Sequence, residues 1–141
     1  MNNVDCVFCR IVAGTIPAVR VYEDEHHLAI MDIGPIVKGH VLVMPKAHYQ
    51  DIHALPEDDL KALAGCVKTV CRALRNGLHA EGINIIQNNG RVAGQLVPHV
   101  HFHLIPRFAD DGHHWNWDAK KYDSDDEMQK YAARIRSGLQ E

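Results

Sequence analysis

The sequence predicts an α+β fold: an antiparallel five-stranded sheet, one long helix and a C-terminal helix. Three observations support this class. Segments rich in aliphatic and β-branched residues are separated by turn signals, as antiparallel strands are. One long stretch has apolar residues at helical spacing. Finally, imidazole alternates with bulky apolar residues over 98–107, which is the period of a strand with two different faces.

The first three strands are expected in the N-terminal third of the chain. Residues 19–24 and 26–33 are separated by a tight acidic turn, which predicts a hairpin. Residues 39–48 are rich in β-branched and aliphatic side chains, with Gly39 at the start and Pro45 near the end. Together these segments indicate a meander of antiparallel strands.

The long helix is expected to begin at Pro56 and to stop at Gly77. Three acidic residues fill its first turn, and Arg72 and Arg75 lie near its end, both in agreement with the helix dipole. Cys66 and Cys71 are expected to pack as small hydrophobic residues. One apolar stripe recurs at helical spacing and predicts the face that packs on the sheet: Leu60, Leu63, Val67, Val70, Cys71 and Leu74.

Two further strands and a tail complete the predicted fold. Residues 82–90 end in a turn signal, and residues 98–107 form the fifth strand. In the tail, Ser124 and Glu127 have the spacing of a capping box, which predicts a short helix after them. We expect the tail tryptophans, Trp115 and Trp117, to anchor that helix rather than to cover a pocket rim.

Length and charge limit the classes of function. The 141 residues predict one domain over 1–141, with a core of about 1–108 and an extension at 109–141. A net charge of -3 argues against nucleic-acid binding, which needs a basic surface. No apolar run is long enough for a signal peptide or a membrane span, so we expect a cytoplasmic protein without a membrane partner. The open sheet edges predict either a covering tail or pairing with a second subunit.

A metal site is one interpretation of the alternating histidines. Cys6 and Cys9 have the C-x-x-C spacing of a metal knuckle or a redox pair, but a tetrahedral structural zinc needs two more ligands. His48, at the end of the third strand, and His99 are candidates, since antiparallel neighbours could bring them together. The alternative is that both cysteines are unligated near a flexible end.

Catalysis is the other interpretation, and it uses the two remaining histidines. A neutral imidazole is a competent nucleophile near pH 7, so His101 and His103 could attack phosphorus and assist the leaving group. Gln95 could supply an amide donor, and Gly94 would allow close approach of the backbone. Three histidines on one strand face without any role is the least favoured interpretation.

The motif HVHFHLI resembles the signature of the histidine triad family of nucleotide hydrolases and transferases, most closely its bacterial Hint-type branch. The resemblance spans roughly the first 108 residues. It includes CVFC, DIGP, GHVLVMPKAH, the NNG turn and AGQLVPHVHFH. It implies the fold of that family and a homodimer in which two sheets join.

The resemblance also implies roles for individual residues. His101 would be the nucleophile that carries the nucleotidyl group, and His103 would contact the phosphate and leaving group. Asp32 would hold the ribose hydroxyls, and the less favoured alternative is that it caps the DIGP turn. A structural zinc would be held by Cys6, Cys9, His48 and His99.

Further substrate contacts are implied around this centre. Asn88 and Gln95 would hold the phosphate and leaving-group side, and His40 would line the same pocket. Leu96 stands where eukaryotic Hint proteins have a serine that assists the leaving group, which puts efficient amine release in question. Three apolar residues are candidates for a purine slot or for the core: Ile11, Leu28 and Ile30.

The leading functional hypothesis is hydrolysis of purine nucleoside phosphoramidates or related AMP conjugates through a covalent nucleotidyl-histidine intermediate. A dinucleoside polyphosphate hydrolase or a nucleotidyl transferase would share this chemistry. A nucleotide-binding interaction module without turnover is the alternative outside enzymes. In every case the expected partner is a purine nucleotide.

Overall fold

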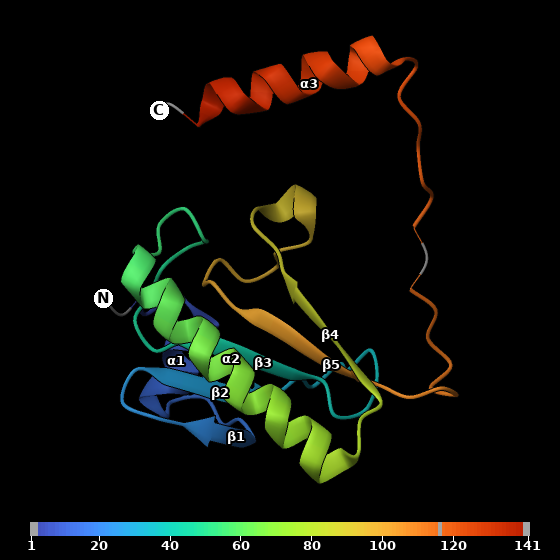
Figure 1. Cartoon of the computed structure of the whole chain (residues 1–141). Helices are drawn as coiled ribbons and strands as arrows, with labels where there is room; N and C mark the ends of the chain where they lie inside the picture. Colours follow the sequence, from blue (N-terminus) through green and yellow to red (C-terminus); the bar gives the residue numbers. More distant parts are fainter. Residues whose placement is uncertain (1–2, 116, 140–141) are drawn as a thin grey trace.

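A five-stranded antiparallel sheet with helices on both faces forms the body of the protein (Figure 1). The structure is a computed structural model and describes residues 3–115 and 117–139. Its elements in chain order are α1 (Val7–Ala13), β1 (Arg20–Glu23), β2 (His27–Met31), β3 (Val41–Pro45), α2 (Glu57–Leu78), β4 (Gly82–Gln87), a 3-10 turn (Arg91–Ala93), β5 (Phe102–Arg107) and α3 (Asp125–Gly138).

The strand order is β1-β2-β3-β5-β4, and every neighbouring pair is antiparallel. The predicted α+β class and five-stranded sheet are therefore confirmed. The predicted meander is wrong in one respect, because β5 inserts between β3 and β4. The long helix α2 makes the connection from β3 to β4, and this connection leaves a place for β5 beside β3. The edges of the sheet are β1 and β4.

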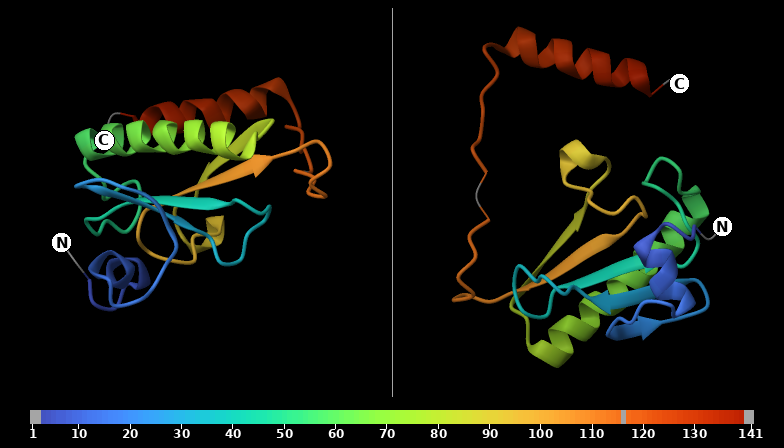
Figure 2. Two further views of the ribbon diagram at one scale, coloured as in Figure 1. Left: turned by 90° about the horizontal axis from the view of Figure 1, so that it is seen from below. Right: turned by 180° about the vertical axis from the view of Figure 1, so that it is seen from behind.

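Alternation along the strands divides the core between the two faces of the sheet. The left view of Figure 2 shows α1 and α2 on opposite faces. The α2 face contains Ala29, Val41, Val43, Val100 and Leu104, packed against the stripe of α2. The α1 face contains Leu28, Ile30, Leu42 and Met44, packed against Phe8 and Ile11.

Helix α1 was not expected from the sequence. It has only seven residues, too few for a periodic apolar pattern to stand out. Cys6 caps it, since its Sγ accepts a hydrogen bond from the backbone N–H of Cys9 at 3.4 Å. Gly14 ends it in the left-handed conformation at φ 80°. The C-x-x-C pair is thus the first turn of a helix.

The end of α2 also differs slightly from expectation. Pro56 precedes the first helical residue, as predicted, but Gly77 remains helical and the helix continues to Leu78. His79 then adopts the left-handed conformation at φ 55° and ends the helix. Gly77 is therefore not the stop, because the residue that leaves helical geometry lies two positions later.

The C-terminal extension lies apart from the body (Figure 1). Ser124 caps α3 by accepting a hydrogen bond from the backbone N–H of Glu127 at 3.1 Å, which confirms the predicted cap. No residue of α3 is buried. Trp115 packs edge-on against His113, and Trp117 is 79 % exposed. The predicted anchoring by the tryptophans is wrong, since the extended segment before α3 holds the helix away from the core.

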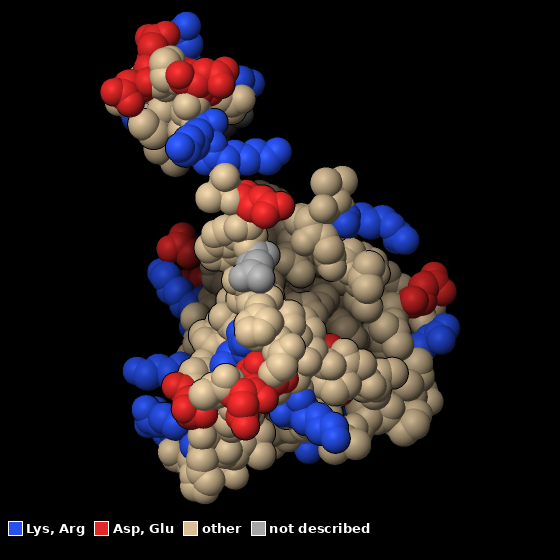
Figure 3. Space-filling view, turned by 90° about the vertical axis from the view of Figure 1, so that its right-hand side faces the viewer, with Lys and Arg blue, Asp and Glu red and all other residues tan. Residues whose placement is uncertain are grey.

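Within the described residues, no helix is long and apolar enough to cross a membrane. Figure 3 shows acidic and basic side chains interspersed at the margins of the face it presents, with an uncharged, hollowed region between them. That face carries no continuous basic patch, in agreement with the negative net charge.

Candidate active site and metal centre

The alternating histidines lie on the α1 face of the sheet. Only His103 falls inside β5; His99 and His101 precede it, so the predicted strand begins later than expected. The backbone N–H of Val100 nevertheless donates to the carbonyl of Tyr49 at 2.7 Å, and this contact holds the segment extended beside the chain that follows β3. The intervening Val100 is fully buried on the α2 face. The two-faced pattern is therefore preserved.

His99 joins the N-terminal cysteines. Its Nε2 lies 2.8 Å from the carbonyl of Pro45. Because a carbonyl only accepts, Nε2 carries the proton and Nδ1 presents its lone pair. That Nδ1 lies 3.4 Å from Sγ of Cys6 and 3.6 Å from Sγ of Cys9. The fourth residue, His48, has its Nδ1 at 3.4 Å from Sγ of Cys9 and 3.2 Å from Nδ1 of His99.

These separations fit a tetrahedral metal site. Zn–S bonds of about 2.3 Å and Zn–N bonds of about 2.0–2.1 Å place tetrahedral ligand atoms about 3.3–3.6 Å apart for N···N and S···N pairs. The observed 3.2–3.6 Å agree with these values. Burial lowers the pKa of His99 to about 4, so the imidazole is in the neutral form that binds metal. The four residues thus form a candidate metal centre.

His101 is held in one tautomer by the backbone. Its Nδ1 lies 2.7 Å from the carbonyl of His99, so Nδ1 carries the proton and Nε2 is left with its lone pair. The ring packs edge-on against Phe8 at 5.0 Å between centroids and is 6 % exposed. Burial lowers the pKa of His101. Near neutral pH the residue is therefore an uncharged imidazole with a free Nε2.

His103 receives its orientation from His40. The backbone N–H of Ile36 donates to Nδ1 of His40 at 3.2 Å, so the proton of His40 lies on Nε2. That Nε2 donates to Nδ1 of His103 at 3.0 Å. His103 consequently carries its own proton on Nε2. Burial lowers the pKa of His40 and, more strongly, that of His103, to about 4.

Asp32 caps the DIGP turn and also lines the pocket. Its Oδ1 accepts a hydrogen bond from the backbone N–H of Gly34 at 2.8 Å, which caps the turn. Its Oδ2 lies 3.6 Å from Nε2 of His40, and the side chain lines the pocket described below. The turn therefore fixes a carboxylate at the pocket wall.

The pocket has a volume of about 360 Å³ and brings together His101, His103 and Asp32. Its walls are mostly apolar, as in most small-molecule sites of proteins. Of the three predicted slot residues, Ile11 and Ile30 line it, whereas Leu28 does not and is fully buried in the core. The exposed Leu96 lies at the wall, in the position discussed above for serine.

Sequence reasoning missed Phe8, which lines this pocket and packs against both His99 and His101. Its ring lies between the metal centre and the pocket and contacts both. The signal in the sequence was its position between the two cysteines. A side chain between two metal ligands lies close to the other ligands of the same metal.

Gln95 and Asn88 are placed differently. Gln95 is 7 % exposed, and its amide is fully engaged with the backbone: Oε1 accepts from Gly90, and Nε2 donates to the carbonyls of Gln50 and Val97. Gln95 therefore stabilises the loop in which it lies and does not line the pocket. Asn88 does not line the pocket either; its Nδ2 lies 3.5 Å from where a Cβ added to the pocket residue Gly94 would be.

A profile described as the HIT domain matches residues 13–110, which include the three histidines and Asp32. The chain belongs to the HIT family. This confirms the resemblance inferred from the sequence. It also agrees with the fold, since solved HIT-family structures have the same architecture.

Three relatives illustrate the range of HIT proteins to which the chain is similar. The Bacillus subtilis protein named Protein hit is 41 % identical over 96 % of this chain and 94 % of its own length. A Candida albicans adenosine 5'-monophosphoramidase is 41 % identical over 75 % of this chain and 72 % of its own. An Arabidopsis thaliana adenylylsulfatase is 38 % identical over 73 % of this chain and 52 % of its own.

Two solved structures are similar over nearly the whole chain. A HIT-family crystal structure from Bacillus subtilis has a TM-score of 0.86, with 38 % identity and coverage of 94 % of this chain and 96 % of that one. A Zn-bound histidine triad protein from Mycobacterium smegmatis has a TM-score of 0.74 and 40 % identity, with the same coverage. The relatives support a nucleotide hydrolase activity for the family to which this chain belongs.

Proposed function

We propose that this protein hydrolyses purine nucleoside phosphoramidates or related AMP conjugates through a covalent nucleotidyl group on His101. One observation supports this most: the free Nε2 of His101 belongs to a residue that lines the same pocket as His103 and Asp32. Two relatives, an AMP phosphoramidase and an adenylylsulfatase by name, point to the same class of substrate.

In the first step, the lone pair of His101 Nε2 forms a bond to the α-phosphorus. The bond between phosphorus and the leaving group breaks, and the leaving group takes that electron pair. His103 donates a hydrogen bond from Nε2–H to a phosphate oxygen and stabilises the charge that develops there, and the leaving group takes its proton from solvent. In the second step, water attacks phosphorus, its proton goes to solvent, and the bond from phosphorus to His101 Nε2 breaks, which releases AMP and the neutral imidazole.

The tautomers suit these roles without any rearrangement. The carbonyl of His99 fixes the proton of His101 on Nδ1, so the nucleophilic nitrogen needs no separate base. The His40 ring fixes the proton of His103 on Nε2 in the same way. Asp32 would accept hydrogen bonds from the ribose hydroxyls, and the apolar walls formed by Ile11 and Ile30 would enclose the purine.

We further propose that the metal centre holds zinc in a structural role. The Zn-bound relative supports the identity of the ion, and the S···N and N···N separations support its geometry. Four protein ligands leave no open position for substrate or water. When bound, the ion ties the first turn of α1 to the segment that carries the catalytic histidines.

A homodimer joined along β4 accounts for the open edge of the sheet. β4 is paired on one side alone, and its Ile85 is 53 % exposed. Unpaired edges favour association with a second strand. Ile85→Lys should therefore raise the monomer fraction measured by light scattering after size exclusion, whereas an equal change at the exposed Val92, outside the strands, should not.

Product analysis tests the proposed reaction. Wild-type protein should convert adenosine 5'-phosphoramidate to AMP, and His101→Asn should not. His53→Asn, which changes an exposed histidine outside the pocket, serves as the matched control. Products that depend on an added acceptor would instead indicate a transferase, and preferred cleavage of dinucleoside polyphosphates would indicate that hydrolase class. Nucleotide binding without any turnover would contradict the proposal in favour of a binding module.

A further inference from the structure

A separate group of metal-ligating side chains lies on the α2 face, away from the pocket. Asp24 comes from the turn between β1 and β2, His27 from the start of β2, and Cys66 from the middle of α2. One ligand atom from each lies within 4.8 Å of the others. His27 is 8 % exposed and Cys66 is 5 % exposed. Three ligand types that zinc uses in proteins thus converge, with the half-buried Asp24 on the solvent side of the group.

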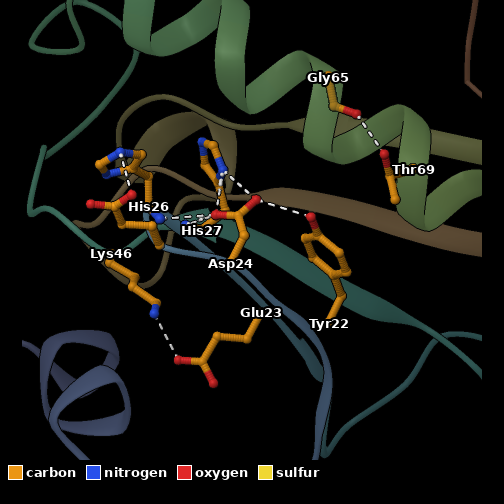
Figure 4. A network of polar contacts seen from close by, with 9 residues as sticks. Tyr22, Glu23, Asp24, His26, His27, Lys46, Gly65 and Thr69 are labelled. Atoms are coloured by element: carbon orange, nitrogen blue, oxygen red, sulfur yellow. Dashed lines mark hydrogen bonds and ion pairs between the residues drawn. The ribbon is translucent and has the colours of Figure 1, made fainter.

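The turn holds Asp24 firmly in this position (Figure 4). Nδ1 of His27 lies 3.0 and 3.1 Å from its two carboxylate oxygens, and the hydroxyl of Tyr22 donates to Oδ2 at 3.0 Å. The backbone N–H groups of His26 and His27 donate to Oδ1. Burial alone would raise the pKa of Asp24, but these hydrogen bonds lower it to about 2. The carboxylate is therefore ionised near neutral pH.

Cys66 is electrostatically suited to exchange its proton for a cation. Burial and then the charge of Asp24 raise the pKa of this thiol to about 11. The same negative charge that holds the proton on sulfur would attract a metal ion. A thiophilic ion commonly replaces such a proton, because the metal neutralises the thiolate directly.

A small cavity opens beside one member of the group, His27. It has a volume of about 170 Å³ and is lined by His27 together with residues of β3, the chain after it and α2, whereas Asp24 and Cys66 lie outside its wall. Lys46, at the same wall, pairs with Glu23 at 2.8 Å, which offsets its charge. Water in this cavity reaches the group on the side of His27.

We propose that Asp24, His27 and Cys66 bind a further thiophilic divalent ion, such as Zn²⁺, with water as its fourth ligand. The ion takes the place of the thiol proton of Cys66, which goes to solvent, and His27 binds as a neutral imidazole. Such an ion would link the β1–β2 turn to α2 across the sheet face. The site is independent of the proposed reaction, because none of its residues lines the active-site pocket.

Metal stoichiometry tests the site in the full-length chain. After saturation with zinc and desalting, elemental mass spectrometry would give the number of zinc ions bound per chain. Substitution by Co²⁺ would be followed through the thiolate-to-metal charge-transfer absorption band. The variants are Cys66→Ser and His27→Gln. Cys71→Ser is the matched control, since Cys71 lies on the same helix outside the group. Circular dichroism would verify that each variant is folded.

We expect Cys66→Ser and His27→Gln each to bind one ion per chain fewer than wild type, and Cys71→Ser to bind as many as wild type. If Cys66→Ser does not fold, His27→Gln decides the question. Unchanged stoichiometry in the folded variants would overturn the proposal. So would the loss of an ion in Cys66→Ser alone, because the histidine would then not be a ligand and the thiol would be binding metal adventitiously.

Discussion

The two faces of the sheet are built from the same alternating strands but hold different chemistry. On the α1 face, buried histidines lie beside Phe8 and the cysteine pair, and backbone carbonyls fix the protons of His99 and His101. On the α2 face, the interior is mainly aliphatic, and its polar group lies at the end near the β1–β2 turn. We therefore expect the α2 face to contribute most of the stability, whereas the α1 face exposes reactive groups to a pocket.

Substitution of the proposed nucleophile on the α1 face should change turnover more than any other change considered below. His101→Asn removes the nucleophilic Nε2 and should lower kcat by at least about 10³-fold, since covalent catalysis depends on that atom. The melting temperature should change little. A loss of turnover without a loss of stability is the result expected for a reactive group on the α1 face. AMP release and thermal unfolding, measured on the same preparation, check it. A variant that keeps most of its activity would contradict the assignment of the nucleophile.

The opposite result is expected on the α2 face. Leu63→Ala removes a fully buried side chain from α2 and should cost about 2–5 kcal/mol of unfolding free energy. Turnover of the folded variant should remain close to wild type. Urea unfolding measures the loss, and Leu78→Ala, at a 45 % exposed position near the end of the same helix, should cost much less. Equal losses at the two positions would refute this view of the core.

Removal of the metal centre should give an intermediate effect on stability. Cys9→Ser removes one ligand and should lower the melting temperature by several degrees, because binding energy at a structural site is also folding energy. A strong chelator should lower the melting temperature of wild type in the same direction and add little in the variant. Cys71→Ser is the control. An unchanged melting curve in Cys9→Ser would argue against a structural metal.

The pH dependence of the unfolding free energy should change least. Burial lowers the pKa of His103 to about 4, whereas an unfolded histidine titrates near 6.5. Between these values the unfolded chain binds more protons, so stability rises with pH through this window and is lost as pH falls from about 6.5 toward 4. His103→Gln should reduce this slope. Urea unfolding at several pH values measures it, and an identical slope in the variant would contradict the burial argument.

The sequence predicted what depends on local period and on motif spacing. Alternation between histidine and apolar residues correctly placed His99, His101 and His103 on one face, and helical spacing identified the buried face of α2. The cysteine pair with His48 and His99 came together as expected. Each of these patterns survives folding because strands and helices impose a fixed side-chain direction.

What the sequence did not predict depends on contacts between distant segments. The insertion of β5 between β3 and β4 and the full engagement of Gln95 by the backbone are tertiary features. The group formed by Asp24, His27 and Cys66 joins a turn to a helix nearly forty residues away along the chain, a distance that no short motif records. The tautomers of His99 and His101 likewise follow from the positions of backbone carbonyls, which are known only in the fold.

The most direct test of the account is intact-protein mass spectrometry of samples quenched during turnover of adenosine 5'-phosphoramidate. Wild type should show a transient increase in mass equal to one adenylyl group, and His53→Asn should show the same adduct. His101→Asn should show none. AMP release by wild type without an adduct, or an adduct that persists in His101→Asn, would contradict nucleotidyl transfer through His101.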